Sequence, residues 1–245
     1  MARLLLYDYI SSICSQMARL ALVEKQLEFE RRQVDIMENN EQFEPWYVKL
    51  NPRAVVPTLQ ISDEVVTDTI RIVNRVQEFP GPDLSGDKSC QAWLRDIMDL
   101  HYGVLMYRQR LDPDGTAPQI VARGKFLHRL AAERHDLGPV ISQRIEGNRR
   151  FQELLKDPAA IELHVAATRA LVDRMINAVR QTNFLAGNTY SLADCFATAA
   201  LARFKIHGFE HWWSGTPLDD YYECMRSRPS FAVAEVIETG SERDL

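Results

Sequence analysis

The chain has 245 residues, of which 46% are hydrophobic and 26% are charged, and its formal net charge is −5. This composition indicates an ordinary globular protein with one large core or two modest ones. The acidic balance argues against nucleic acid and anionic membranes as main partners, because both bind a basic face. No apolar run approaches the roughly 20 residues that span a bilayer, and the start at 1–6 is too short for a signal peptide, so we expect a cytoplasmic protein.

Residues 1–79 alternate strand and helix signals. In chain order, strands are predicted at 4–7, 28–35, 55–61 and 64–66, and helices at 15–25, 39–50 and 70–76. The resulting βαβαββα order predicts a compact α/β unit. Pro57 cannot donate a hydrogen bond to a sheet, so it belongs at a strand start or edge. The sequence leaves open whether the Val56–Pro57 bond is cis or trans.

The segment at 79–87 is rich in Pro, Gly and Asp and is the predicted linker between two domains. The patterns beyond it are almost entirely helical. We therefore predict an α/β domain at 1–79 and an all-α domain at 89–245.

The second domain contains several predicted helices. They cover 89–110, 158–181, 217–227 and 231–237. Ser191 and Asp194 form a capping box ahead of a further apolar helix, which we expect to be the core of this domain. Residues 117–156 are a charged insertion with helical stretches, and 239–245 are a polar tail expected to fray.

The cysteines and histidines give no metal signature. No pair of cysteines has CxxC or metal-like spacing, so in a reducing compartment we expect free thiols. The cysteines are Cys14, Cys90, Cys195 and Cys224. His207 and His211 have a spacing that binds zinc on helices. However, Gly208 lies between them and no paired carboxylate ligand accompanies them, so we predict no metal.

Cys14 lies where the first predicted strand meets the first helix, between Ser12 and Ser15. The N–H groups and the positive dipole end of a helix start favour an anion. A thiol at this position is therefore expected to have a lowered pKa, and the thiolate is the nucleophile. The alternative is that Cys14 is a small apolar residue packed behind the first strand.

The order of four features resembles the glutathione transferase superfamily. They are Cys14 at the first helical turn, Val56-Pro57 before a hairpin, Asp68-Thr69 at a helix start, and residues 190–194 at the start of a buried helix. Within the superfamily, the chain resembles the tetrachlorohydroquinone reductive dehalogenases. The segments that carry this likeness are 9–15, 33–36, 43–51, 54–59, 190–194, 201–203 and 226–231.

The resemblance implies a thioredoxin-like α/β domain followed by an all-α domain, glutathione as co-substrate, and a homodimer. Ser12, Cys14 and Arg19 also form a pattern similar to the zeta class, which includes maleylacetoacetate isomerase. An isomerase, a conjugating transferase, and a binding protein without turnover are therefore alternatives to a dehalogenase.

The resemblance also assigns residues to the parts of glutathione. It implies that Asp68 binds the amino group and Thr69 the carboxylate of the γ-glutamyl end. The backbone of Val56, ahead of a cis Pro57, holds the cysteinyl part in the manner of an added strand.

Two further roles follow from the same resemblance. Lys49 or Arg53 meets the glycine carboxylate, and the choice between them stays open. Ser12 donates a hydrogen bond to the glutathione sulfur and favours its thiolate.

In a dehalogenase-like mechanism, the glutathione thiolate displaces halide from a quinoid tautomer of the substrate. Cys14 then attacks the sulfur of the adduct and holds glutathione as a mixed disulfide, which a second glutathione resolves.

The substrate is expected to be a small aromatic or quinoid electrophile. Tyr102 and Arg108 are the candidate contacts, because an aromatic stripe on the helix after the linker faces the active site in this family. Aromatic side chains at helical spacing are more often core, and charged side chains near a helix end are usually solvated.

Overall fold

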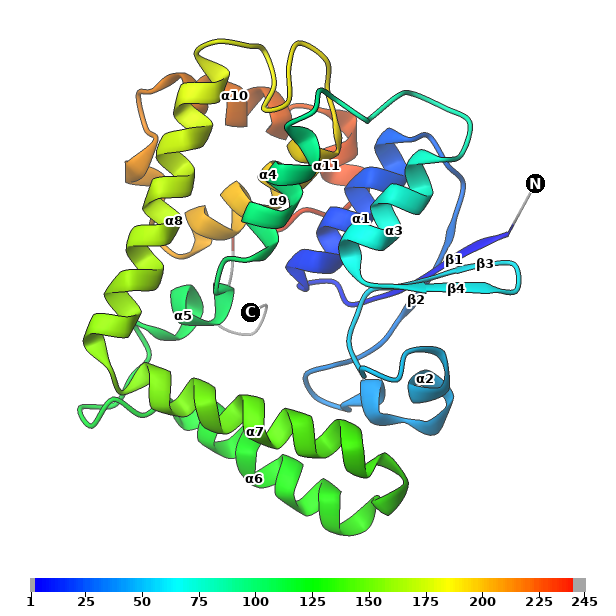
Figure 1. The fold of residues 1–245 in the computed structure, drawn as a ribbon, viewed down its shortest axis with the longest axis vertical. Coiled ribbons are helices and arrows are strands. Elements are labelled where there is room, and N and C mark those ends of the chain that lie inside the picture. Colours follow the sequence, from blue (N-terminus) through cyan, green and yellow to red (C-terminus); the bar gives the residue numbers. More distant parts are fainter. Residues whose placement is uncertain (1–2, 240–245) are drawn as a thin grey trace. The chain divides into compact units, whose positions relative to one another are not determined.

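A computed structural model describes residues 3–239 (Figure 1). Contacts group the chain into two compact units, which are residues 1–99 with 171–245, and residues 100–170. This division by contacts does not test the domain boundary predicted at 79–89. That boundary stays a prediction. Among the described residues, no helix has the length and apolar character needed to cross a membrane.

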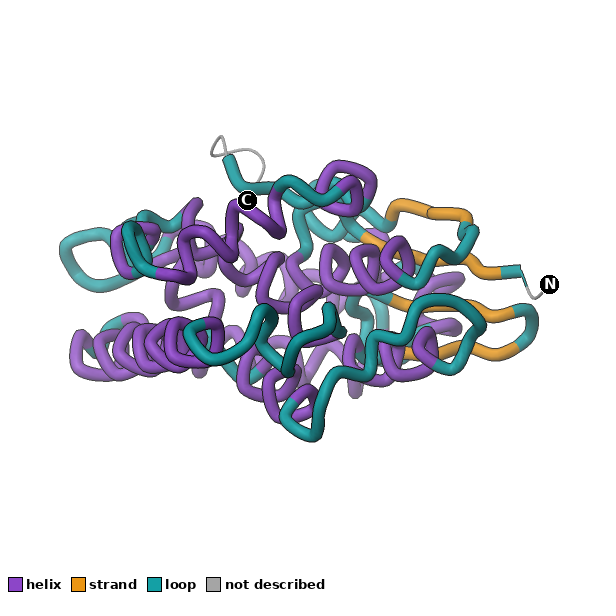
Figure 2. Tube along the Cα trace, turned by 90° about the horizontal axis from the view of Figure 1, so that it is seen from above, coloured by secondary structure: helices purple, strands orange, loops and turns teal. Residues whose placement is uncertain are grey.

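The first unit contains a mixed sheet in the order β2-β1-β3-β4, and Figure 2 shows these strands gathered together. The strands are β1 (Leu4–Asp8), β2 (Glu30–Gln33), β3 (Thr58–Ile61) and β4 (Glu64–Thr67). β1 runs parallel to β2 and antiparallel to β3, and β3 and β4 form a hairpin. α1 (Ile13–Glu24) and α2 (Pro45–Leu50) lie between strands in the chain, and α3 (Thr69–Gln77) follows β4; a 3-10 turn at Glu41–Phe43 precedes α2. The predicted βαβαββα order is confirmed.

Side-chain character explains the positions of the strands in the sheet. β1 is central, and its Leu6 is completely buried, because the segment is an apolar run. β2 lies at an edge and consists of exposed polar residues. Pro57 directly precedes β3, and the Val56–Pro57 bond is cis. β3 therefore begins directly after Pro57, as expected for a residue that has no N–H to donate to the sheet.

The helical part of the first unit centres on α9 (Leu192–Ile206), which is buried along nearly its whole length. α1 packs against α3, α9 and α11, and α9 also packs against α4 and α10 (Figure 1). The bounds are α4 (Cys90–Met98), α10 (Pro217–Arg226) and α11 (Pro229–Val233), with a 3-10 turn at Glu210–Trp212. The predicted role of the apolar helix as a core element is confirmed.

The predicted capping box at the start of α9 is also confirmed, and it is larger than expected. The backbone N–H and the hydroxyl of Ser191 both donate to Asp194 at 2.8 Å. The N–H of Leu185 and the hydroxyl of Tyr221 donate to its other oxygen, at 3.0 and 2.7 Å. Burial nevertheless raises the pKa of Asp194. This carboxylate joins three segments of the helical core.

We expect Asp194→Ala to lower the free energy of unfolding by about 3 kcal/mol, because it leaves several buried donors without an acceptor. Urea unfolding followed by circular dichroism measures the loss. The matched control is Asp220→Ala at an exposed position of α10, for which we expect a change below about 1 kcal/mol. Equal losses in the two variants would contradict the joining role of Asp194.

Three predicted helices are wrong in extent. The helix expected at 39–50 begins only at Pro45, after the separate 3-10 turn at Glu41–Phe43. The helix expected at 89–110 is broken after Met98, and His101 caps α5 (Tyr102–Tyr107) by accepting a hydrogen bond from Val104 N–H at 3.3 Å. The helix expected at 231–237 ends at Val233, because Glu235 has a φ of 51° in the left-handed region. Residues 240–245 of the predicted tail lie outside the described residues.

The second unit contains α5, α6 (Pro118–Glu133), α7 (Gly138–Leu155) and the first part of α8 (Pro158–Val179), with a 3-10 turn at His135–Leu137. α6 and α7 lie side by side as a helical hairpin (Figure 1). The predicted insertion at 117–156 is therefore ordered as two helices. Gly138 and Pro139 begin α7 rather than interrupt it, since proline is well accommodated in a first helical turn.

Candidate active site

The sequence places Cys14 at the start of α1, and the structure confirms this position. Ser12 is the N-cap residue with extended backbone angles, and its hydroxyl accepts a hydrogen bond from Ser15 N–H at 3.3 Å. Cys14 is the second residue of the helix and is half-buried. The Ser12 hydroxyl keeps its own proton available for donation while it accepts from the helix.

The electrostatics of Cys14 differ from expectation. Burial raises the pKa of Cys14, and the negative charge of Asp68 raises it further. A hydrogen bond with the Thr69 side chain, the positive charge of Arg203 and the Cys14 backbone amide lower this pKa, but they do not offset burial. The predicted lowering of the pKa is therefore wrong, because removal from water outweighs the effect of the helix start.

The predicted pair Asp68 and Thr69 lies beside Cys14. Asp68 is the N-cap of α3, with a φ of 89°, and its carboxylate accepts a hydrogen bond from Arg71 N–H at 3.2 Å. Thr69 is the first residue of the helix and is buried. Two helix starts therefore meet at the Cys14 sulfur.

The two candidates for the glycine carboxylate of glutathione lie in different surroundings. Arg53 approaches Asp68, with 3.6 Å between Nη2 and Oδ2. Lys49 is an exposed residue in the last turn of α2. The structure thus groups Arg53 with the Asp68 carboxylate.

The segment before Pro57 is held by residues that the sequence analysis missed. Tyr47 OH and Asn51 Nδ2 both donate to the carbonyl oxygen of Val55, at 2.6 and 2.8 Å. Both side chains also contact Thr58 Oγ1 at 3.0 Å. Burial raises the pKa of Tyr47 to about 12, so this hydroxyl stays a donor. The available sequence signal was the pair Asn51-Pro52, which ends the short helix that carries Tyr47.

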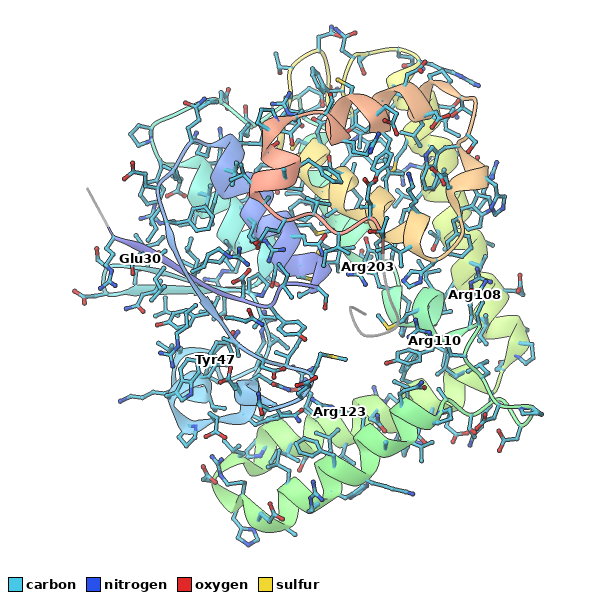
Figure 3. The ribbon with its side chains drawn as sticks, turned by 180° about the vertical axis from the view of Figure 1, so that it is seen from behind. Glu30, Tyr47, Arg108, Arg110, Arg123 and Arg203 are labelled. Atoms are coloured by element: carbon cyan, nitrogen blue, oxygen red, sulfur yellow. The ribbon has the colours of Figure 1, made fainter. Side chains whose placement is uncertain are left out.

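Arg203 is a second missed residue. It extends from α9, is almost fully buried, and donates from Nη2 to the carbonyl oxygen of Ser11 at 2.5 Å (Figure 3). Its charge acts on Cys14. A lone arginine inside the apolar run of α9 was the available signal, because a buried charge needs a specific partner.

Arg19 holds the turn between β1 and α1. Its guanidinium donates to the carbonyl oxygen of Ile10 at 2.9 Å and to Asp8 Oδ2 at 2.5 Å. It also donates to the carbonyl oxygens of Ala234 at 2.7 Å and Glu235 at 3.3 Å. Arg19 and Asp8 are both buried. The loop that carries Ser12 is therefore tied to the segment after α11.

The two candidate substrate contacts belong to the second unit. Tyr102 begins α5, and Arg108 follows its end. Arg108 lines a cavity of about 450 Å³ in this unit together with Lys156 and Glu162. Contact of Tyr102 and Arg108 with a substrate stays a prediction.

The histidine pair lies at the end of α9. His207 is a buried C-cap residue, and His211 Nδ1 is 2.9 Å from the carbonyl oxygen of Gly208. Within the described residues, no three His, Cys, Asp or Glu side chains gather as a metal site. The cysteines Cys14, Cys90, Cys195 and Cys224 are free thiols, as expected.

We expect Asp68→Asn and Thr69→Val to shift the pKa of Cys14 in opposite directions. Asp68→Asn removes a negative charge but keeps a capping side chain, so the pKa falls and alkylation at neutral pH is faster. Thr69→Val removes a hydrogen bond, so the pKa rises and alkylation is slower. Mass spectrometry of the Cys14 peptide after iodoacetamide treatment across pH measures both shifts. Shifts of the same sign would contradict this account of the charges.

The fold and the site define a class of protein: a thioredoxin-like sheet domain with a half-buried cysteine at the start of its first helix, followed by a helical domain. A family model described as "Glutathione S-transferase, N-terminal domain" matches residues 11–78. The chain is 31% identical over 242 residues to tetrachloro-p-hydroquinone reductive dehalogenase from Sphingobium chlorophenolicum. The alignment covers 95% of this chain and 95% of that relative. It is 27% identical to glutathione S-transferase TCHQD from Arabidopsis thaliana, over 92% of this chain and 87% of that relative.

A solved structure supports the same fold. β-Etherase LigF from Sphingobium sp. strain SYK-6 matches with a TM-score of 0.71 at 20% identity, over 94% of this chain and 98% of that chain. The chain belongs to the glutathione transferase family and is an enzyme of that family. The predicted fold class, a thioredoxin-like N-terminal domain plus an all-α C-terminal domain, is confirmed.

Proposed function

We propose that the protein is a glutathione-dependent reductive dehalogenase that acts on a halogenated hydroquinone or a related aromatic. The observation that carries this proposal is the position of Cys14, half-buried at a helix start, hydrogen-bonded to Thr69 and under the charge of Arg203. The likeness to the Sphingobium dehalogenase along nearly the whole chain supports the same chemistry.

Glutathione binds along the edge of the sheet domain in this proposal. The Asp68 carboxylate takes the amino group of the γ-glutamyl end, and the Thr69 hydroxyl takes its carboxylate. The backbone of Val56, ahead of Pro57, pairs with the cysteinyl part as an added strand does. Arg53 or Lys49 pairs with the glycine carboxylate.

The first chemical step uses the sulfur of glutathione. The Ser12 hydroxyl donates a hydrogen bond to this sulfur and stabilises its thiolate, since a hydrogen bond to the charged form favours that form. The thiolate attacks the carbon that bears the halogen in the quinoid tautomer of the substrate. A carbon–sulfur bond forms, and halide leaves with the electron pair of its bond.

The second step uses Cys14. Its thiolate attacks the sulfur of the adduct, so a disulfide forms while the carbon–sulfur bond breaks. The aromatic carbon keeps the electron pair and takes a proton, which reduces the ring. A second glutathione then attacks the mixed disulfide and leaves as oxidised glutathione. The sum is one aryl halide and two glutathiones converted to the reduced aromatic, oxidised glutathione, halide and a proton.

The raised pKa of Cys14 makes the rate of this second step depend on pH. Because the thiol is mostly protonated at neutral pH, the thiolate fraction and the rate of the second step increase as pH rises toward that pKa. Arg203 opposes the effect of burial, so its charge is part of what makes the thiolate accessible.

Product analysis of the wild-type protein with glutathione and trichlorohydroquinone tests the proposal. We expect halide and oxidised glutathione in equal amounts, together with a hydroquinone that has lost one chlorine. A stable thioether as the final product would instead assign a conjugating transferase. Binding of glutathione with no product would assign a protein without turnover. Incubation with maleylacetoacetate tests the isomerase alternative, since an isomerase converts it and leaves glutathione unchanged.

The family resemblance extends the proposal to assembly and location. We expect a cytoplasmic homodimer, and light scattering on purified protein should give twice the mass of the 28.1 kDa chain. A mass of one chain at working concentration would contradict the dimer.

A further inference from the structure

The side chain of His101 caps the start of α5. The ring nitrogen Nδ1 of this half-buried residue accepts a hydrogen bond from Val104 N–H at 3.3 Å. The carbonyl oxygen of His101 accepts from the same N–H at 2.9 Å. Nδ1 can accept only while it carries no proton, so the proton of the neutral ring lies on Nε2. The cap therefore requires an uncharged imidazole in one tautomer.

Aromatic groups from two other helices of the second unit enclose the His101 ring. Phe151 on α7 stacks on it, with 5.0 Å between centroids and 23° between planes. His164 on α8 meets it edge-on, at 5.1 Å between centroids. Gly103 leaves room for this packing, because a Cβ at that position would lie 2.9 Å from Phe151 Cζ and 3.4 Å from His101 Cε1. The neighbouring groups thus hold the ring in its capping position.

These surroundings oppose a positive charge on the ring. Burial lowers the pKa of His101, and the charge of His164 lowers it further. A hydrogen bond to the backbone of His101 itself acts in the opposite direction, but it does not offset the other two effects. Of the described residues on α5, α7 and α8, His164 is the one whose charge acts on the ring. His101 is therefore neutral at pH 7, and the cap is in place.

We propose that His101 is a pH-sensitive switch that keeps α5 folded at neutral pH and releases its first turn in mild acid. A proton taken up from solvent at Nδ1 turns this acceptor into a donor. The new N–H repels Val104 N–H and competes with it for the carbonyl oxygen of His101. Loss of the N-cap then frees the start of a helix that has only six residues.

The lowered pKa gives the direction of the effect. The unfolded chain binds a proton at the ordinary histidine value of about 6.5, whereas folded His101 binds one only at a lower pH. Its contribution to stability is therefore complete above about pH 6.5 and is lost as the pH falls from there through the folded value. α5 carries Tyr102 and is followed by Arg108, so its opening displaces both candidate substrate contacts. That last consequence rests on the proposed function, whereas the switch does not.

Hydrogen exchange on the full-length protein without glutathione tests the switch. Mass spectrometry of peptides that cover 99–108 gives the protection of α5 at about pH 7.5 and at about pH 5, on either side of the range in which histidine titrates. The rates are corrected for the intrinsic dependence of amide exchange on pH. We expect the protection of Val104 and Leu105 to fall about fivefold in acid, the size of effect that a lost N-cap predicts.

Three variants assign the effect to the ring. His101→Asn keeps a good capping side chain that does not titrate, so its α5 should stay protected in acid. His164→Phe keeps an aromatic contact and removes the neighbouring charge, so α5 should open at a higher pH than in the wild type. His128→Asn is the matched control, because it removes an exposed histidine of α6 in the same unit, and it should open as the wild type does.

Two exchange results would overturn the switch. One is equal protection of α5 at both pH values in the wild type, and the other is an acid loss in His101→Asn as large as in the wild type. If His101→Asn does not fold, nuclear magnetic resonance of the wild type with isotope-labelled histidine replaces it. We then expect His101 to carry its proton on Nε2 at neutral pH, and a proton on Nδ1 would refute the cap. None of these measurements uses glutathione, so a failed turnover assay counts against the dehalogenase alone.

Discussion

A Cys14→Ser protein is expected to form the glutathionyl-aromatic adduct and to stop there. A serine hydroxyl cannot take the place of a thiolate in exchange with sulfur, so the reduced aromatic should form at least about 10³-fold more slowly. Removing Cys14 leaves Ser12, Asp68 and Thr69 in place, so the first step and the binding of glutathione should persist. Chromatography of the products measures the accumulated adduct.

Protein mass gives a second readout of the same variant. The wild type should gain one glutathione on the Cys14 peptide, and free glutathione should remove it, whereas Cys14→Ser should gain none. Cys224→Ser is the matched control, because Cys224 is an exposed thiol on α10, and it should behave as the wild type does. The same products from Cys14→Ser and the wild type would end the mixed-disulfide mechanism.

Replacing Arg19 by methionine is expected to lower the free energy of unfolding by about 3–5 kcal/mol. The substitution leaves the buried Asp8 carboxylate without its shortest ion pair and removes the donors to the carbonyl oxygens of Ile10 and Ala234. The Asp8 carboxylate and the Ala234 carbonyl oxygen are then left without this donor in a region with little access to water. Urea unfolding measures the loss.

Arg31→Met is the control for Arg19. Arg31 also contacts Asp8, at 2.9 Å, but its side chain is 30% exposed and lies at the outer strand β2. We expect a loss of about 1 kcal/mol, since partly exposed pairs contribute little. An equal loss of unfolding free energy for Arg19→Met and Arg31→Met would show that the positive charge beside Asp8 stabilises the fold and that the hydrogen bonds of Arg19 to the main chain do not.

Local chemistry explains which parts of the fold the sequence predicts. The strand at 4–7, the helix start at Asp68-Thr69 and the box at Ser191 and Asp194 each depend on residues a few positions apart, and all are confirmed. The break between α4 and α5 escaped prediction because a histidine side chain serves as its cap, which is an uncommon choice.

Long-range contacts explain most of what was missed at the candidate site. Arg203 reaches Ser11 from 192 positions away, and Arg19 reaches Ala234 across 215 positions. The sign of the Cys14 pKa shift depends on how much water the surrounding segments exclude, and a one-dimensional pattern does not contain that information. The position of the thiol was predictable, but its acidity was not.

The contact between Arg19 and the segment directly after α11 has a consequence for variation and for engineering. Because Ala234 and Glu235 contribute carbonyl oxygens, exchange of the Ala234 side chain leaves these bonds in place. A polypeptide that terminates before Ala234 lacks both acceptors, whatever its composition. Truncation before residue 234 should therefore be tolerated less well than exchange of the side chain at that position.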